Sequence, residues 1–359
     1  MARTRIQQSP TWRRQLALAL ALIGSLIFSA SAAARAEVCR ITQFSRGITH
    51  GQVEGIAAGP DGNMWFTEAG GAGAIARITP RGQVTEFTDG ITQGAPADIV
   101  AGPDGNMWFT EAGGAGAIAR ITPQGQVTEF AGGLTPDNSP AGIAVGPDGN
   151  LWFTEDGDSG TIGRITPEGA ITEFTGGTSE FTEGITLGAP EGIAAGADGN
   201  LWVTEARGAG AVARITTSGA LAEFPSGGDS SEITAGPGPS MWFTEAAGRI
   251  GRITSSGRVR AFSRGIARGS LPKGIARGAD GDMWFTEERA AGFSTGAVAR
   301  ITPTGHVTEF RFRPNLLAWD IAAGPARSIW FTEFGGRVGR IAAGCRPAAR
   351  KRVKPADGR

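Results

Sequence analysis

The sequence has no tyrosine, two cysteines (Cys39 and Cys345) and two histidines (His50 and His306) among 359 residues. Without tyrosine there is no phenol to serve as a catalytic acid or base, and the cysteines and histidines are too few for a zinc site of the usual Cys/His kind. Neither sign of charge predominates, because 34 Lys and Arg balance 34 Asp and Glu. We therefore expect no nucleic-acid partner.

The sequence also lacks an apolar run long enough to span a membrane. The longest is segment 16–28, which follows a basic start and precedes the triplet Ala34-Arg35-Ala36. As a helix this run would rise about 20 Å, whereas a membrane span needs roughly 30 Å. The pattern is typical of a cleaved secretory signal. We predict a signal peptide over residues 1–36, no membrane span after its cleavage, and an exported bacterial protein that is periplasmic or secreted.

Glycine and proline, by contrast, are abundant, with 58 and 20 residues. They recur in seven repeats, each marked by Met-Trp-Phe-Thr-Glu or a close variant with its Trp at 65, 108, 152, 202, 242, 284 and 330. Turn signals such as Asp61-Gly62 and the Thr-Pro-x-Gly stretch 79–82 divide each repeat into four short strands. Four strands in about 45 residues match a propeller blade. The sequence predicts an all-β, seven-bladed β-propeller with four-stranded antiparallel blades.

The ends of the repeats favour a closed ring over an open solenoid. The seventh repeat ends after Val338-Gly-Arg-Ile341 without a fourth strand, whereas segment 40–44 matches the fourth strands of the other repeats. We predict that this N-terminal strand completes the last blade, which leaves no free sheet edge between the first and last blades.

Cys39 and Cys345 both align with the turn between the third and fourth strands. We predict a disulfide between them that seals the ring, with two separate thiols as the alternative. The propeller is assigned to residues 37–345. The tail, residues 346–359, is basic and is expected to be disordered. We expect a monomer.

The residue that opens each innermost strand is expected to ring the mouth of the central channel. In chain order the ring is Glu54, Ala97, Ala141, Glu191, Ser231, Lys273 and Trp319, with Asp98, Glu232 and Asp320 beside it where other repeats have Gly. The ring varies while the scaffold repeats, and variable positions on a rigid scaffold commonly carry function. We expect a ligand to contact Glu54, Glu191, Lys273, Trp319 and Asp320. Arg264 and Arg268 near Lys273 suggest an anionic ligand.

Each repeat also carries one Glu and one third-strand Arg, such as Glu68 and Arg77. Seven identical pairs favour a structural role, and we expect cross-strand ion pairs. His50 lies in a crossing on the same face as the ring, and we favour a solvated loop histidine there, with an imidazole that acts as a base as the alternative. His306 is expected to be inert.

Residues 142–174 contain Gly-Ile-Ala-x-Gly-Pro-Asp-Gly-Asn-Leu-Trp-Phe-Thr-Glu, then Ile-Gly-Arg-Ile-Thr-Pro-x-Gly and Ile-Thr-Glu-Phe. This combination resembles the virginiamycin B lyase (streptogramin B lyase) family, and the resemblance extends over about residues 38–344. It implies a seven-bladed propeller that opens the ester of cyclic depsipeptide antibiotics by Mg²⁺-dependent elimination. In that family a histidine base and carboxylates act at the channel mouth.

The positions of that machinery hold other residues here. Lys273 stands where the resemblance places one histidine, and Trp319 stands where it places the base. Leu317 and Phe334 occupy the positions of the two metal-binding glutamates, and Glu333 lies one residue short.

Two hypotheses follow. The first is an exported propeller, non-catalytic or differently catalytic, that binds a small molecule, glycan or peptide at the channel mouth and needs no cofactor for its fold. The second is an active Mg²⁺-dependent streptogramin B lyase with a rearranged site. Lys273 or His50 would then be the base, and Glu333 the candidate metal ligand. A protein-binding platform is a third possibility.

Overall fold

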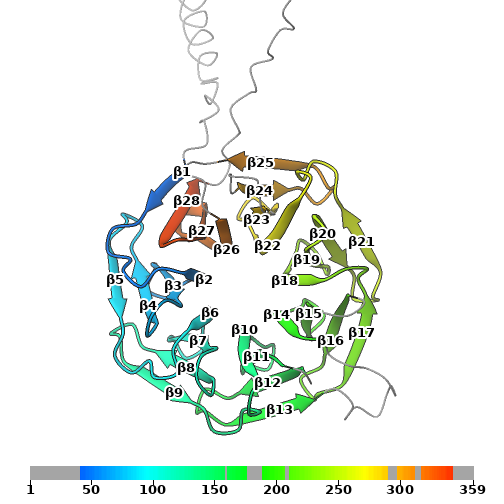
Figure 1. The fold of residues 1–359 in the computed structure, drawn as a ribbon. Helices are drawn as coiled ribbons and strands as arrows, with labels where there is room; N and C mark the ends of the chain where they lie inside the picture. Colours follow the sequence, from blue (N-terminus) through cyan, green and yellow to red (C-terminus); the bar gives the residue numbers. More distant parts are fainter. Residues whose placement is uncertain are drawn as a thin grey trace, which may run out of the picture. The chain divides into compact units, whose positions relative to one another are not determined.

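The computed structural model describes residues 41–157, 160–175, 188–206, 210–289, 297–311 and 317–342. In these residues the strands form seven four-stranded antiparallel sheets, and a short 3-10 helix, η1 (Pro325–Arg327), precedes one strand of the last sheet. The sheets are arranged as blades around a common axis (Figure 1). The prediction of an all-β, seven-bladed propeller is confirmed.

Each blade runs from an innermost to an outermost strand. Blades 1 to 4 consist of β2 (Val53–Ala58), β3 (Met64–Glu68), β4 (Ala74–Ile78) and β5 (Val84–Phe87); β6 (Pro96–Ala101), β7 (Met107–Glu111), β8 (Ala117–Ile121) and β9 (Val127–Phe130); β10 (Ser139–Val145), β11 (Leu151–Asp156), β12 (Thr161–Ile165) and β13 (Ile171–Thr175); β14 (Pro190–Ala195), β15 (Leu201–Glu205), β16 (Ala211–Ile215) and β17 (Leu221–Pro225). Blades 5 to 7 consist of β18 (Ser230–Ala235), β19 (Met241–Glu245), β20 (Arg249–Ile253) and β21 (Val259–Phe262); β22 (Ser270–Arg277), β23 (Met283–Arg289), β24 (Ala297–Ile301) and β25 (Val307–Arg311); β26 (Leu317–Gly324), β27 (Ser328–Phe334), β28 (Arg337–Ala342) and β1 (Ile41–Phe44).

The N-terminal strand closes the ring. β1 pairs antiparallel with β28, from Ile41 opposite Ile341 to Phe44 opposite Val338. The predicted closure is therefore confirmed. Cys39, Cys345, the leader 1–36 and the tail 346–359 lie outside the described residues, so the disulfide, the signal peptide and the disordered tail stay predictions. Among the described residues, no helix is long and apolar enough to cross a membrane.

A buried Trp in each blade connects two parts of the fold: it stacks on a Phe in the outermost strand of its own blade and packs against the next blade. Trp65 on β3 stacks on Phe87 of β5, with ring centroids 5.5 Å apart, and also packs against Ile99 and Phe109 of blade 2. The same Trp–Phe stack occurs in all seven blades. The repeated tryptophans are all buried. Burial of one Trp per blade junction therefore drives the packing between blades.

The expected pairing of the repeated Glu with the third-strand Arg is wrong. Arg77 lies opposite Trp65 in the β3–β4 register, whereas Glu68 lies opposite Ala74, near the other end of the strand pair. The guanidinium of Arg77 instead covers the Trp65 ring at 5.4 Å and lies 3.5 Å from Asp61 in the Asp-Gly turn. The β3–β4 register therefore keeps the Glu68 and Arg77 side chains apart, and Arg77 covers the aromatic stack.

Candidate functional site

A bulge at the start of every innermost strand presents the residues of the channel mouth. In blade 1, Val53 pairs with Glu68 and Ile56 with Phe66, so Glu54 and Gly55 together lie opposite Thr67. The same register shift occurs in the other six blades. A bulge of this kind redirects a side chain without ending the strand pairing.

The threonine of the repeated Trp-Phe-Thr-Glu phrase holds each bulge in place. The Thr67 hydroxyl accepts a hydrogen bond from Gly55 N and donates one to Ala97 O of the next blade, both at 2.8 Å. Each of the seven threonines makes both bonds, from Thr332 back to Glu54 O as well. This role was not predicted from the sequence, although the threonine recurs in all seven repeats.

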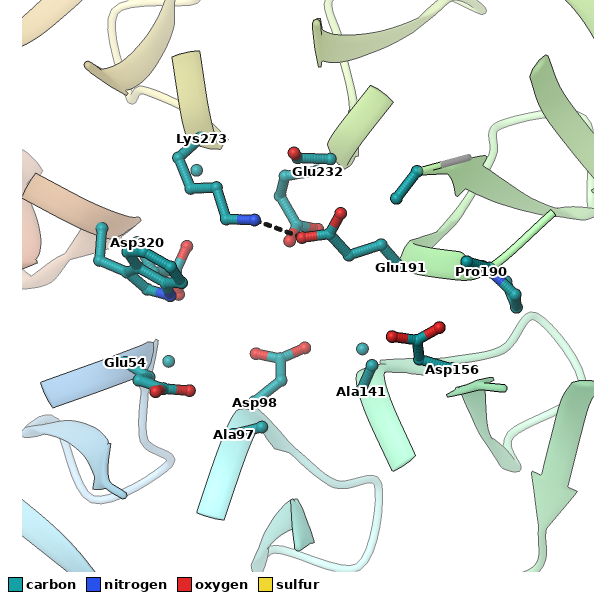
Figure 2. Close-up of a pocket in the computed structure, with 17 residues that line it drawn as sticks. Glu54, Ala97, Asp98, Ala141, Asp156, Pro190, Glu191, Glu232, Lys273 and Asp320 are labelled. Atoms are coloured by element: carbon teal, nitrogen blue, oxygen red, sulfur yellow. Dashed lines mark hydrogen bonds and ion pairs between the residues drawn. The ribbon is translucent and has the colours of Figure 1, made fainter. Parts of the chain in front are cut away.

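The bulges surround one cavity of about 350 Å³. All seven predicted ring residues line it: Glu54, Ala97, Ala141, Glu191, Ser231, Lys273 and Trp319. Asp98, Glu232 and Asp320 line it too, and Figure 2 shows these carboxyl groups converging with Glu54 and Glu191. Sequence reasoning missed Asp156 and Pro190, which line one side of the cavity. That the cavity binds a ligand stays a prediction.

Lys273 bridges three blades across this cavity. Its Nζ donates to Glu191 Oε1, the contact dashed in Figure 2, and lies 5.0 Å from the centroid of the Trp319 ring. A carboxylate and an aromatic face are both partners that an amine of this kind binds. The Lys273 amine is therefore engaged by Glu191 and Trp319 and is not free to act as a base.

The second position of the bulge is a carboxylic acid in three blades, namely Asp98, Glu232 and Asp320. Asp98 accepts hydrogen bonds from Ile99 N at 2.7 Å and, across the blade boundary, from Ile143 N at 2.9 Å. Asp320 bonds in the same way to Ile321 N and to Ile56 N of blade 1.

The blade before each of these carboxyl groups has glycine at the equivalent position. A Cβ on Gly55 would approach Asp98 Cα to 2.9 Å, and one on Gly274 would approach Asp320 Oδ1 to 2.8 Å. Gly192 stands in the same relation to Glu232 Oε1. The glycines that precede the acids around the ring therefore provide the space that the acids occupy.

Burial raises the pKa of several carboxyl groups at the cavity, so that they are partly protonated at neutral pH. It raises the pKa of Glu54 to about 7, against the lowering effect of Lys273. Burial and the nearby Asp98 raise the pKa of Asp320 to about 7, and burial together with Asp98 and Asp320 raises the pKa of Glu232 well above its usual value. Six carboxyl groups and one amine line the cavity. This acidic lining does not fit the anionic ligand expected from sequence.

The other predicted site residues lie away from the cavity. His50 is in the crossing between β1 and β2, where its backbone N donates to Glu68 Oε2 at 2.9 Å. Glu333 is buried, and its two oxygens accept from Gln43 Nε2 at 2.6 and 2.9 Å. His306 lines a separate hollow with Arg264 and the β21 strand. The cavity lining includes none of these side chains.

Residues 31–180 and 174–349 match the virginiamycin B lyase family. The chain belongs to this family. A streptogramin B lyase structure has a TM-score of 0.74 at 28% identity and covers 84% of this chain and 97% of its own. A catalytically inactive virginiamycin B lyase from Staphylococcus aureus, solved with quinupristin, has a TM-score of 0.72 at 30% identity and covers 85% and 99%.

An extracellular domain of a hybrid two-component system from B. thetaiotaomicron shares the fold alone, with a TM-score of 0.65 at 13% identity over 84% of this chain and 41% of that one. No curated protein matches the sequence.

The metal position implied by the virginiamycin B lyase family does not fit Mg²⁺ in this chain. Leu317 and Phe334, at the two expected glutamate positions, lie directly opposite each other in the β26–β27 register. The Phe334 ring is 5.7 Å from the Trp319 ring and is 37% exposed. Mg²⁺ requires oxygen ligands, and this pair offers none from its side chains. The two positions instead form an apolar surface beside Trp319.

Proposed function

We propose that this protein is an exported propeller that binds a small, peptide-like molecule carrying an amino group at its channel mouth, without opening it by elimination. One observation carries the proposal: at the positions of the family's two histidines stand Lys273, which is ion-paired with Glu191, and Trp319, whose ring lies beside that amine, and at its metal positions Leu317 and Phe334 form an apolar pair. Elimination needs a base on the acidic C–H and an electrophile for the developing oxyanion. These residues supply neither.

The lining of the cavity indicates the ligand chemistry. Buried carboxyl groups that repel one another hold protons, and an entering ammonium group would favour their ionised forms. The exposed ring of Phe334 and the neighbouring Trp319 offer apolar contact next to this acidic region. A ligand with both a cationic and an aromatic or aliphatic part satisfies the two regions together.

The first test separates binding from catalysis. Mature protein is incubated with quinupristin, with and without Mg²⁺, while chromatography follows ring opening and calorimetry follows binding. We expect binding without ring opening, and at least about tenfold weaker binding for Trp319→Ala. His306→Ala, outside the cavity, is the matched control and keeps the parent affinity. Absence of binding, or Mg²⁺-dependent opening, refutes the proposal.

The second test addresses ligand charge. The tripeptide Arg-Trp-Arg and its counterpart Glu-Trp-Glu are titrated into the protein under identical conditions. We expect the basic peptide to bind at least about tenfold more tightly, because the acidic lining repels the other. Equal affinities, or tighter binding of the acidic peptide, contradict the proposed ligand class.

A rearranged lyase is the second candidate function. It is favoured by Glu54, which lines the cavity and whose pKa of about 7 suits a general base at neutral pH. If the protein opens quinupristin, Glu54→Gln abolishes the opening and Ser231→Ala, at another ring position, does not. Loss in Lys273→Ala or His50→Ala instead assigns the base to one of those residues.

A further inference from the structure

A second cluster of metal-ligating side chains lies outside the cavity, at the outer part of blade 1. The crossing from β1 to β2 places His50 beside Glu68, at the end of β3, and Glu86, on β5. One potential ligand atom from each of the three lies within 4.8 Å of the other two. The His50 Nδ1 is 3.8 Å from Glu86 Oε2, and the crossing is fastened to Glu86 by the Thr49 hydroxyl at 2.7 Å.

The buried carboxyl group of Glu68 gives this cluster a place where a cation would be stabilised. Its side chain is fully buried, and Oε1 has no hydrogen-bond partner. Burial, and to a smaller extent the charge of Glu86, raises the pKa of Glu68 to about 8. A buried carboxylate oxygen without a partner is costly, and either a proton or a cation relieves that cost.

Blade 2 contains the same carboxyl pair without an imidazole. Gln93 N donates to Glu111 Oε2 at 3.1 Å and Thr92 donates to Glu129, as His50 and Thr49 do in blade 1. The side-chain oxygen of Gln93 accepts from Ala115 N, 3.1 Å away, and so is already engaged. The carboxyl pair is thus part of the repeated scaffold. Among the described residues, only His50 adds an imidazole to such a pair.

We propose that His50, Glu68 and Glu86 bind one divalent transition-metal ion of the zinc type. An imidazole nitrogen with two carboxylate oxygens is a ligand set that such ions accept, whereas Mg²⁺ prefers oxygen alone. The His50 and Glu86 side chains are 27% and 17% exposed, so an ion can enter from solvent. Water can complete its coordination.

The position of the site gives binding a structural consequence. His50 belongs to the segment that links β1, the outer strand of blade 7, to β2, the inner strand of blade 1. An ion shared by this segment, β3 and β5 would fasten the ring closure to blade 1. Because it would bind the folded chain, Zn²⁺ should also raise the melting temperature.

Equilibrium dialysis of the EDTA-stripped protein against Zn²⁺ tests the site, with metal analysis of the retained ion. We expect one ion per chain that is lost in His50→Gln, which gives blade 1 the residue of blade 2. Glu86→Gln weakens binding at least about tenfold. Glu129→Gln, the same change at the equivalent half-buried position of blade 2, leaves binding unchanged.

Thermal denaturation with and without Zn²⁺ provides the second readout. The ion raises the melting temperature of the parent and of Glu129→Gln, but not that of His50→Gln, and Mg²⁺ at the same concentration has no such effect. The proposal is overturned if the parent binds no Zn²⁺ or if His50→Gln binds it equally well. Equal weakening by Glu86→Gln and Glu129→Gln overturns it too. None of these outcomes depends on ligand binding in the channel.

Discussion

Replacing Thr244 by valine tests whether the threonine hydroxyls hold the channel mouth together. Thr244 is fully buried, accepts from Glu232 N at 3.0 Å and donates to Lys273 O at 2.7 Å. Valine has nearly the same shape but neither accepts nor donates. The substitution leaves packing intact, but the Glu232 amide and the Lys273 carbonyl, both beside the cavity, lose the hydroxyl with which they form hydrogen bonds.

The expected magnitude follows from those two groups. A buried donor or acceptor that loses its partner costs about 1–3 kcal/mol, so Thr244→Val, which leaves two such groups, should lower the free energy of unfolding by about 2–6 kcal/mol. This is a large part of the roughly 5–15 kcal/mol that stabilises a typical protein. Thr244→Ser keeps the hydroxyl and loses one methyl group, which should cost about 1 kcal/mol.

Urea denaturation followed by tryptophan fluorescence measures both variants against the parent. The valine variant should unfold at a clearly lower urea concentration than the serine variant. If valine costs less than serine, or less than about 1 kcal/mol, then the hydroxyl bonds do not hold the bulge and the assigned role of the repeated threonine is wrong.

Three further predictions concern substitutions of single charged residues. Lys273→Met removes the cation that lowers the pKa of Glu54, so carboxyl NMR titration should place that pKa above its present value of about 7, and an unchanged or lower pKa contradicts the assignment. Burial and Glu129 raise the pKa of Glu111 to about 8, so the folded chain keeps a proton that the unfolded chain releases, and stability falls as pH rises from about 4.5 to 8. Glu111→Gln should thus be about 1–3 kcal/mol more stable than the parent at pH 8.5 and equal to it at pH 4, and thermal melts at the two pH values that show no such difference refute the shift. Arg164→Lys gives up planar stacking on Trp152 and Phe174 and should cost about 1 kcal/mol by denaturation, unlike Arg258→Lys at an exposed position, and equal costs would refute the aromatic cap.

The blades and their closure could be predicted because their signals are local and repeated. Asp61-Gly62 and its equivalents mark hairpins that hold wherever they occur, and the missing fourth strand of the last repeat has one available partner, segment 41–44. The residues that ring the channel mouth could be predicted for the same reason. Once blades are equivalent, the residue that opens one innermost strand occupies the same place in all of them.

The contacts that depend on register could not be predicted. Pairing Glu68 with Arg77 requires both at the same end of the β3–β4 pair, but Trp65 takes the place opposite Arg77. The bulge is not apparent from the sequence because it is defined by the β2–β3 register, in which Glu54 and Gly55 together lie opposite Thr67. Asp98 bonds to Ile143 N in the next blade, and nothing in either repeat alone indicates that bond.

The direction of the threonine bonds explains how the mouth can change chemistry within a constant scaffold. Every bond ends on a backbone amide or carbonyl of the bulge, and none depends on the ring side chain. A substitution at Lys273 or Trp319 therefore alters what the cavity presents without loosening the strand that presents it. The same independence lets Leu317 and Phe334 form an apolar pair where the resemblance places two metal-binding glutamates, because their facing positions come from the β26–β27 register. The scaffold thus accounts for membership of the family, whereas the chemistry of the mouth is set by a few side chains that the scaffold leaves free to vary.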